Sequence, residues 1–174
     1  LPPAMPEPPE DETIVQDLRP AVTGRTITRA RLSHDDVLRG VTRAGLERGL
    51  AQATIRTVTR RAKHAIFELH TAHGDRRLVV QPGMTGALLT YDRPLTDDEK
   101  RYAVLRAGFD GGGELVYRDV RRLGTLLLLD DAGWRAYDGA LGPEPLDDAF
   151  TFLAMAASFQ RSRQAIKKVL MDQR

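Results

Sequence analysis

Three consecutive residues near the start of the chain, Met5-Pro6-Glu7, have types and an order that could do chemistry. Proline is small enough for an initiator methionine in front of it to be removed, which would leave Pro6 with a free secondary amine. Such an amine is a potential nucleophile, whereas the nitrogen of a proline inside a peptide is an amide. Leu1 to Ala4 precede Met5 in this sequence. The chemistry available at Pro6 therefore depends on whether those residues are present in the working protein.

Basic side chains gather in three separate segments. The net charge of the 174-residue chain is only +2, so the clustering is more informative than the total. The clusters are Arg56, Arg60, Arg61 and Lys63, then Arg118, Arg121 and Arg122, and finally Arg161, Arg163, Lys167 and Lys168. Arginine and lysine supply most phosphate contacts in nucleic-acid complexes, so the clusters could line a polyanion. Solvated faces balanced by nearby acids are the equally frequent alternative.

Other candidate motifs are weaker. His70 and His73 have a spacing found in metal sites, but they lie in an expected hairpin turn and lack a third ligand. Gly111–Gly113 is not followed by the Lys-Ser/Thr of a phosphate-binding loop. Two aspartate pairs fit turns and helix caps better than a catalytic carboxylate pair, namely Asp130-Asp131 and Asp147-Asp148.

Composition excludes several classes of protein. The chain has no cysteine, so this stretch holds neither a disulfide framework nor a thiolate zinc site. No apolar run approaches the roughly 20 residues of a membrane span, and the first residues lack the charged and apolar regions of a signal peptide. We therefore expect a cytoplasmic protein with no membrane partner. A length of 174 residues suits one domain, or one domain and a fragment of a second.

The elements that must position these residues are mostly strands. A short amphipathic helix is predicted from Glu10 to Val22, where acidic residues open the first turn and Gly24 supplies a stop. Alternating apolar positions between turn formers predict strands in residues 26–33, 53–69, 76–91, 100–109, 114–120 and 124–130. Glycine-containing turns at 70–77 and 109–115 predict hairpins, and a weaker helical pattern covers 35–50. Many short strands with little helix between them predict a sandwich or barrel.

The composition changes after the last strand. Residues 138–147 are rich in turn formers and read as a linker, whereas residues 148–174 combine helix formers with apolar positions at helical spacing. We therefore predict a β domain over residues 6–137 and the beginning of a helical domain over 148–174. Residues 1–5 would be an extension or tag remnant plus the initiator methionine. One or two helices cannot close a core of their own, so we expect the helical domain to be truncated here.

Several motifs, in the same order along the chain, resemble the formamidopyrimidine-DNA glycosylase / endonuclease VIII family of base-excision repair enzymes. MPEPPEDETI resembles the family's N-terminal MPELPEVETI, and TVTRRAKHAIFEL resembles its basic strand pair. QPGMTGALL resembles HLGMSGRL, RDVRRLGTLLLL resembles TDPRRFGRLLL, and LGPEPLDDAF resembles the interdomain linker. AIKKVLMDQ matches the start of the helix-two-turn-helix module. The resemblance runs from Met5 onward and favours the formamidopyrimidine branch.

The resemblance implies a fold and an activity. The fold is mostly β with flanking helices, a two-sheet β-sandwich followed by the start of a helix-two-turn-helix domain. The activity is that of a bifunctional DNA glycosylase and AP lyase that excises oxidised purines from damaged double-stranded DNA. We expect a bacterial protein that acts as a monomer at the nucleoid. No cofactor is expected in this chain, and zinc is expected only if a zinc finger follows residue 174.

The resemblance also implies catalytic roles for three residues. Pro6 would be the nucleophile that attacks C1′ of the damaged nucleotide, expels the base and holds the sugar as a Schiff base before elimination cuts the strand. Glu7 would be the general acid that protonates the sugar ring or the leaving group. Lys63 would contact phosphate and assist the elimination.

A second implied set binds DNA. A base taken out of the stack leaves a hole that must be filled, and the residues matching the family's plug are Met84, Arg121 and Leu123. Arg121 would hydrogen-bond the orphaned partner base, normally a cytosine, and Leu123 replaces an aromatic residue, so its stacking should be weaker. Further DNA-binding positions are matched by Lys100, Arg163 and Lys167.

Departures from the family pattern keep two other readings open. Asp11 occupies an apolar position of the first helix, where burying a charge without a partner would be costly, and Gln81-Pro82 replaces His-Leu before the plug. If Leu1 to Ala4 block the Pro6 amine, the protein would be a non-catalytic relative that binds damaged DNA. The third reading is a β-sandwich interaction domain with no DNA role.

Overall fold

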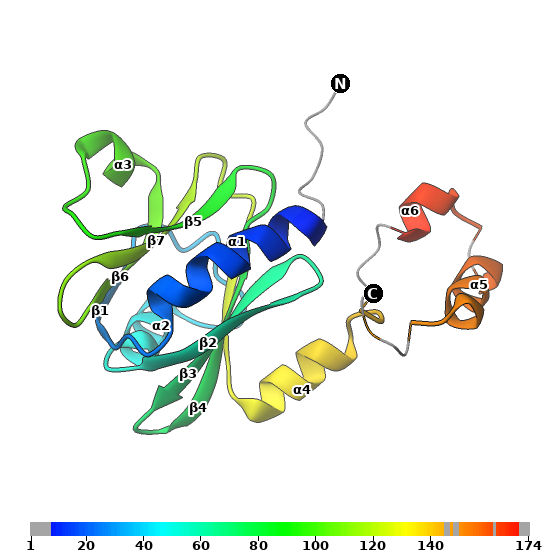
Figure 1. Cartoon of the computed structure of the whole chain (residues 1–174), viewed down its shortest axis with the longest axis horizontal. Helices are drawn as coiled ribbons and strands as arrows, with labels where there is room; N and C mark the ends of the chain where they lie inside the picture. Colours follow the sequence, from blue (N-terminus) through cyan, green and yellow to red (C-terminus); the bar gives the residue numbers. More distant parts are fainter. Residues whose placement is uncertain (1–7, 145–146, 148–149, 162, 171–174) are drawn as a thin grey trace. The chain divides into compact units, whose positions relative to one another are not determined.

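The computed structural model describes residues 8–144, 147, 150–161 and 163–170 of the 174-residue chain (Figure 1). Its strands are β1 (Ile27–Leu32), β2 (Thr54–Arg61), β3 (His64–Thr71), β4 (Gly74–Gln81), β5 (Gly86–Tyr91), β6 (Ala103–Phe109), β7 (Glu114–Asp119) and β8 (Thr125–Leu129). Its helices are α1 (Pro8–Val22), α2 (Arg43–Leu50), α3 (Asp97–Arg101), α4 (Asp131–Gly139), α5 (Phe152–Arg161) and α6 (Ile166–Leu170). The chain divides into two compact units between Trp134 and Arg135.

The first unit contains two antiparallel four-stranded sheets, ordered β1-β6-β7-β5 and β2-β3-β4-β8. The core lies between them, because apolar side chains from both sheets belong to one buried cluster that includes Phe67 and Leu78 from one sheet and Leu105 and Leu115 from the other. Alternation along each strand places these residues on the inner faces. The predicted two-sheet β-sandwich with flanking helices is confirmed.

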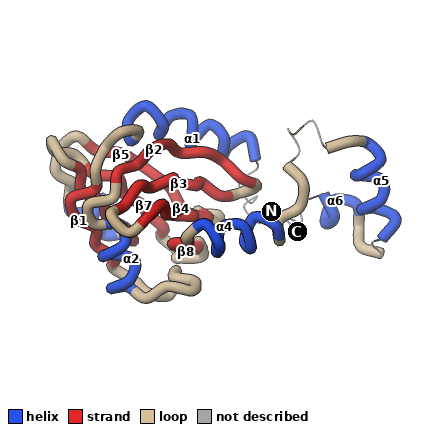
Figure 2. Tube along the Cα trace, turned by 90° about the horizontal axis from the view of Figure 1, so that it is seen from below, coloured by secondary structure: helices blue, strands red, loops and turns tan. Residues whose placement is uncertain are grey.

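Two helices cover the open sides of this sandwich. α1 packs against β2 and β5, the strands at one side of the two sheets, whereas α2 packs against β1 and β8 at the other side. Figure 2 shows the two helices at opposite sides of the strands. Val15 and Val22 from α1 and Leu46 and Leu50 from α2 are buried in the shared core. The helices thereby protect edge strands that would otherwise offer unpaired backbone groups.

The helical pattern predicted for residues 35–50 is only half right, because the helix begins at Arg43. Thr42 caps it by accepting a hydrogen bond from the Gly45 N–H. The preceding residues pair with β8 instead, since the Leu126 N–H donates to the Val37 carbonyl at 2.8 Å and the Arg39 N–H donates to the Leu126 carbonyl at 3.0 Å. Backbone pairing with a neighbouring strand therefore outweighs the local helical preference.

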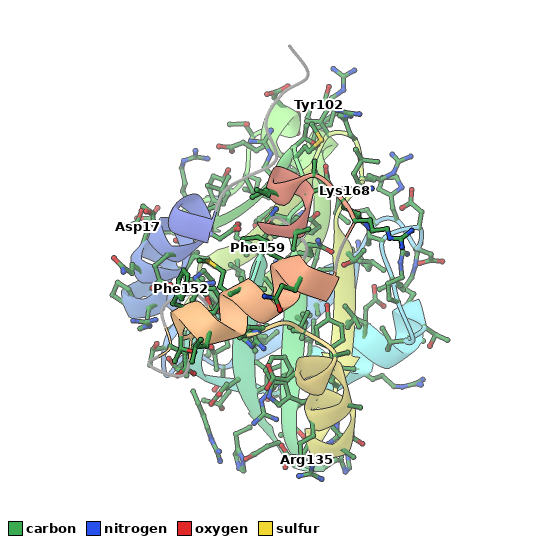
Figure 3. The ribbon with its side chains drawn as sticks, turned by 90° about the vertical axis from the view of Figure 1, so that its right-hand side faces the viewer. Asp17, Tyr102, Arg135, Phe152, Phe159 and Lys168 are labelled. Atoms are coloured by element: carbon green, nitrogen blue, oxygen red, sulfur yellow. The ribbon has the colours of Figure 1, made fainter. Side chains whose placement is uncertain are left out.

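The second unit contains α5 and α6, which contact each other. Phe152 and Phe159 belong to α5 and Lys168 to α6 (Figure 3). Phe152 and Ile166 are exposed in the structure. The domain limits drawn from the sequence at residues 137 and 148 stay predictions. In the part of the chain that the structure describes, no helix is long and apolar enough to cross a membrane.

Candidate functional site

Pro6 and Glu7, the predicted nucleophile and general acid, lie outside the described residues. The structure begins with α1 at Pro8, so it describes the helix that directly follows this pair. On that helix, Asp11 is buried. The family pattern has an apolar residue at this position. The roles of Pro6 and Glu7 therefore stay predictions, and the described part of the site is built from the elements around them.

The turn between β2 and β3 carries Lys63. The turn is tight because Ala62 adopts a left-handed conformation with φ of 51°. Arg60 donates from Nη1 to the Ala62 carbonyl oxygen at 2.8 Å and from Nε to Glu12 Oε2 at 3.0 Å. Glu12 belongs to the N-terminal half of α1, so these bonds fasten the hairpin that carries Lys63 to the helix that follows the predicted catalytic pair.

Burial shapes the same turn. The Lys63 Nζ atom is shielded from solvent, and His64 beside it is only 3% exposed. Burial lowers the pKa of His64, and the neutral ring donates from Nδ1 to the Arg61 carbonyl oxygen at 3.1 Å. Because Arg61 and His64 are also register partners at the end of the hairpin, this bond closes the turn around Lys63.

The Arg60 anchor predicts a loss of stability when it is removed. The Arg60 side chain is only 5% exposed and its Glu12 partner 33%, so Arg60→Met is expected to lower the free energy of unfolding by about 1–3 kcal/mol. Urea unfolding measures this change. Arg56→Met is the matched control on the same strand, because the Arg56–Asp75 pair is 52% and 40% exposed. This substitution should lower the free energy of unfolding by less than about 1 kcal/mol. Equal losses for the two variants would contradict the anchor.

Two loops bring the predicted plug residues together. Residues 82–85, with Met84, connect β4 to β5, and residues 120–124, with Arg121 and Leu123, connect β7 to β8. Each loop crosses from one sheet to the other. The flanking strands are paired at the point where the loops leave them, since Gln81 is the register partner of Thr125 and Gly86 that of Asp119. The loops therefore lie side by side.

Asp119 joins these loops through its buried carboxylate, which lies at 2% exposure. Its Oδ1 accepts from Thr85 Oγ1 at 2.6 Å and from the Arg121 N–H at 3.2 Å. Its Oδ2 accepts from the Tyr117 hydroxyl at 2.9 Å and from the Gly124 N–H at 2.9 Å. The Thr85 hydroxyl also accepts from the Arg121 N–H at 3.3 Å. One carboxylate thus holds both loops.

These contacts keep Asp119 ionised. Burial raises the pKa of Asp119, but the hydrogen bonds from Thr85, Gly124, Tyr117 and Arg121 together outweigh burial and hold it below the ordinary value of 3.8. Burial and the neighbouring carboxylate raise the pKa of Tyr117, so its hydroxyl stays a donor. Because the pKa of Asp119 is lowered on folding, its contribution to stability is present above pH 3.8 and is lost as the pH falls through the lowered value.

The loops present an exposed surface of mixed character. Leu123 is 53% and Val120 54% exposed, and among the described residues of the first unit these are the large apolar side chains that face solvent. Arg121 beside them is exposed, and Met84 is partly buried. Arg122 adopts a left-handed conformation with φ of 51° and donates from Nε to Asp36 Oδ2 at 2.8 Å. A loop that carries both cationic and apolar side chains suits a ligand with anionic phosphates and stacked bases, as in a nucleic acid.

The structure places Lys100 elsewhere. It lies on α3, where Nζ donates to Asp97 Oδ1 at 3.1 Å. It lines a hollow of about 410 Å³ together with Arg29, Arg106 and the Gly112-Gly113 turn, and no residue of the two plug loops lines that hollow. The DNA-binding role drawn from the resemblance stays a prediction for Lys100.

Arg163 and Lys167 belong to the second unit. Arg163 is exposed and precedes α6, which contains Lys167. Their predicted contacts with DNA also stay predictions.

Sequence reasoning missed Thr85, Tyr117 and Asp119. A signal for Asp119 was present, because Leu115, Tyr117 and Asp119 alternate along β7 and so share its inner face. An acid at an inward position needs donors, and the two neighbouring loops supply them. Of the weaker motifs, His70 Nδ1 lies 2.9 Å from Asp75 Oδ1, and the described residues hold no cluster of three metal-ligating side chains.

Comparisons with known proteins agree on one family. A sequence model described as the formamidopyrimidine-DNA glycosylase N-terminal domain matches residues 5–126. A formamidopyrimidine-DNA glycosylase of Paracoccus denitrificans is 35% identical over 177 residues, which covers 98% of this chain and 61% of the relative. One of Chloroflexus aurantiacus is 37% identical over 171 residues, covering 97% and 59%. The chain thus spans about three fifths of the length of these relatives.

Solved structures give the same result. The Lactococcus lactis enzyme in complex with DNA containing an abasic site matches with a TM-score of 0.82 at 28% identity, over 97% of this chain and 61% of that chain. The wild-type enzyme with DNA containing N7-benzyl-Fapy-dG matches with a TM-score of 0.83 at 28% identity, over the same shares of both chains. These solved neighbours are complexes with damaged DNA.

Proposed function

This chain belongs to the formamidopyrimidine-DNA glycosylase family, and from that premise we propose that it is part of a bifunctional glycosylase and AP lyase that removes oxidised purines from double-stranded DNA. The observation that carries the proposal is the pair of adjacent loops that Asp119 holds together. One loop carries Met84, and the other carries Arg121 and Leu123. An apolar side chain can occupy the space of an extruded nucleotide while a neighbouring arginine bonds to the base left behind.

The catalytic part of the proposal rests on the family. The Pro6 amine attacks C1′ of the damaged nucleotide, so that a bond from nitrogen to C1′ forms as the bond to the base breaks. Glu7 supplies the proton that the sugar ring or the departing base requires. The resulting Schiff base then undergoes elimination with the help of Lys63, which cuts the strand. The anchoring of the Lys63 hairpin to α1 supports this assignment, because α1 directly follows Pro6 and Glu7.

Three further features complete the proposal. The protein acts as a monomer in the bacterial cytoplasm at the nucleoid. Lys100, Arg163 and Lys167 add phosphate contacts, which supply much of the affinity of proteins for DNA. Because the chain has no cysteine, a thiolate zinc site would need residues outside this sequence.

The proposal predicts a specific defect for Arg121→Ala. The wild-type protein is expected to bind a duplex with an abasic-site analogue opposite cytosine more tightly than one with the analogue opposite another base. Its affinity for DNA should fall steeply as the salt concentration rises. Arg121→Ala should lose about 1–3 kcal/mol of this discrimination. Fluorescence anisotropy with the four opposite bases measures it.

Arg48→Ala is the control for this experiment. Arg48 is an exposed cation on α2, which packs on β1 and β8, so the substitution removes the same charge from a surface outside the proposed site. It should leave the opposite-base preference unchanged. If the wild-type protein shows neither salt-dependent DNA binding nor a preference for the damaged duplex, the proposed function is wrong.

A further inference from the structure

The Thr85 hydroxyl on the first loop bonds both to Asp119, at the end of β7, and to Arg121 on the second loop. It donates to Asp119 Oδ1 at 2.6 Å and accepts from the Arg121 N–H at 3.3 Å. Thr85 directly follows Met84, and Arg121 lies two residues before Leu123. The side chains of Thr85, Tyr117 and Asp119, with the Arg121 and Gly124 N–H groups, are called the clasp below.

The clasp leaves little freedom between the loops. Donation to an ionised, buried acceptor gives short and strong hydrogen bonds of about 2.5–2.7 Å. The 2.6 Å between Thr85 Oγ1 and Asp119 Oδ1 lies within that range. The two loop backbones also approach closely, because a Cβ added to Gly83 would lie 3.1 Å from the Gly124 nitrogen. The Tyr117 hydroxyl, besides bonding to Asp119, lies 3.3 Å from the Pro82 carbonyl oxygen of the first loop. Displacing one loop therefore breaks several contacts with the other.

We propose that Thr85 and Asp119 are positioning residues that make the two plug loops act as one body, so that Met84 on one loop and Arg121 with Leu123 on the other engage DNA together. This inference rests on the proposed function. Its consequence is an energetic coupling between residues of different loops. When Met84 fills the space of the extruded nucleotide, Arg121 should bind the orphaned base more tightly.

The choice of variant decides whether a positioning role can be told from a purely structural one. Asp119→Asn would replace one acceptor oxygen by an amide that must face a donor, which leaves buried groups unsatisfied and lowers stability whatever the loops do. Thr85→Val is the sharper variant, because it keeps the β-branched shape of a partly exposed residue and removes only the hydroxyl. Thr85→Ser restores the hydroxyl and serves as the rescue control.

The first measurement needs no DNA. Amide hydrogen exchange followed by NMR should show that Thr85→Val accelerates exchange at the Arg121 N–H by about 2- to 10-fold, the effect of losing one hydrogen bond. Exchange at the Gly124 N–H, which bonds to Asp119 Oδ2, should change by less than about twofold. Thr85→Ser should exchange like the wild type at both sites. If the exchange rate of the Arg121 N–H is unchanged in Thr85→Val, the proposal that Thr85 ties the two loops together is wrong, whatever the DNA-binding results.

The second measurement is a double-mutant cycle of Met84→Ala and Arg121→Ala, read as affinity for the abasic-analogue duplex opposite cytosine. With Thr85 present, the two losses should be non-additive by about threefold or more. In the Thr85→Val background they should become additive within about twofold, and Thr85→Ser should restore the coupling. A structural role alone would lower every affinity without changing additivity.

The outcomes separate the two proposals. Additive losses with Thr85 present, in a protein that still prefers the damaged duplex, overturn the coupling and leave the proposed function standing. A wild-type protein with no preference for the damaged duplex overturns the proposed function and this inference with it. Loss of coupling in Thr85→Val and its return in Thr85→Ser support the inference.

Discussion

Protein whose chain begins at Pro6 is expected to be trapped covalently by borohydride on abasic-site DNA, whereas the same chain with Leu1 to Met5 attached should give at least ~10³-fold less adduct. The reason is the nitrogen itself. At a free terminus it is a secondary amine with an available lone pair, but behind Met5 it is an amide whose lone pair is delocalised into the carbonyl. Denaturing gels measure the adduct, and intact mass defines the N-terminus of each preparation.

Peptide mapping provides the control for this result. The cross-linked peptide from the shorter protein should begin at Pro6 and carry the sugar on its N-terminal nitrogen. Both preparations should bind the abasic-analogue duplex, because the plug loops and the Lys63 hairpin belong to the same β-sandwich in each. An adduct mapped to Lys63, or an undiminished adduct with the five leading residues in place, would contradict the assignment of Pro6 as the nucleophile.

Gly124→Ala is expected to have the largest effect on stability among substitutions in the plug loops. A Cβ at this buried position would overlap the Tyr117 hydroxyl and the Gln81 carbonyl oxygen and would lie 2.9 Å from the Pro82 carbonyl oxygen. Two of these atoms are backbone, so relief requires the end of the β4–β8 pairing to open. We expect a loss of roughly 3 kcal/mol in the free energy of unfolding, measured by urea denaturation, and loss of opposite-base discrimination in the binding assay.

Gly139→Ala is the matched control for Gly124→Ala. It makes the same chemical change at a position where the added Cβ meets nothing within 4 Å, so stability should change by less than about 0.5 kcal/mol. Wild-type stability in Gly124→Ala would show that the loops are loosely packed, and the clasp would then lose its physical basis.

Much of the fold could be predicted because strands follow local rules. The alternation of apolar residues and the glycine turns predicted six strand segments, and their ends lie within a few residues of the strands. Two of these segments, residues 53–69 and 76–91, each became two strands separated by a turn or loop. Two short helices were missed. α3 carries a capping box, with Thr96 accepting from the Glu99 N–H and the Glu99 carboxylate accepting from the Thr96 N–H, a pattern that sequence inspection could have found. α4 has an amphipathic pattern in DAGWRAYDG that sequence inspection could also have found.

The candidate site could be predicted only as a set of separate residues. The resemblance supplied Met84, Arg121 and Leu123 by motif, and the structure lays their loops side by side. It also places Lys100 in a hollow that the plug loops do not line. The contacts of Thr85 and Asp119 were missed because hydrogen bonds between residues 34 positions apart leave no local pattern.

The sequence by itself determined where strands form, the family, and the residue types available for catalysis and DNA binding, because strand alternation, turn residues and motif order are properties of neighbours along the chain. Only the tertiary structure decided that Thr85, Arg121 and Gly124 converge on one buried carboxylate. That convergence depends on which strands pair and in which register. Register is chosen by burying apolar side chains from both sheets in a common core, and so by the whole domain at once.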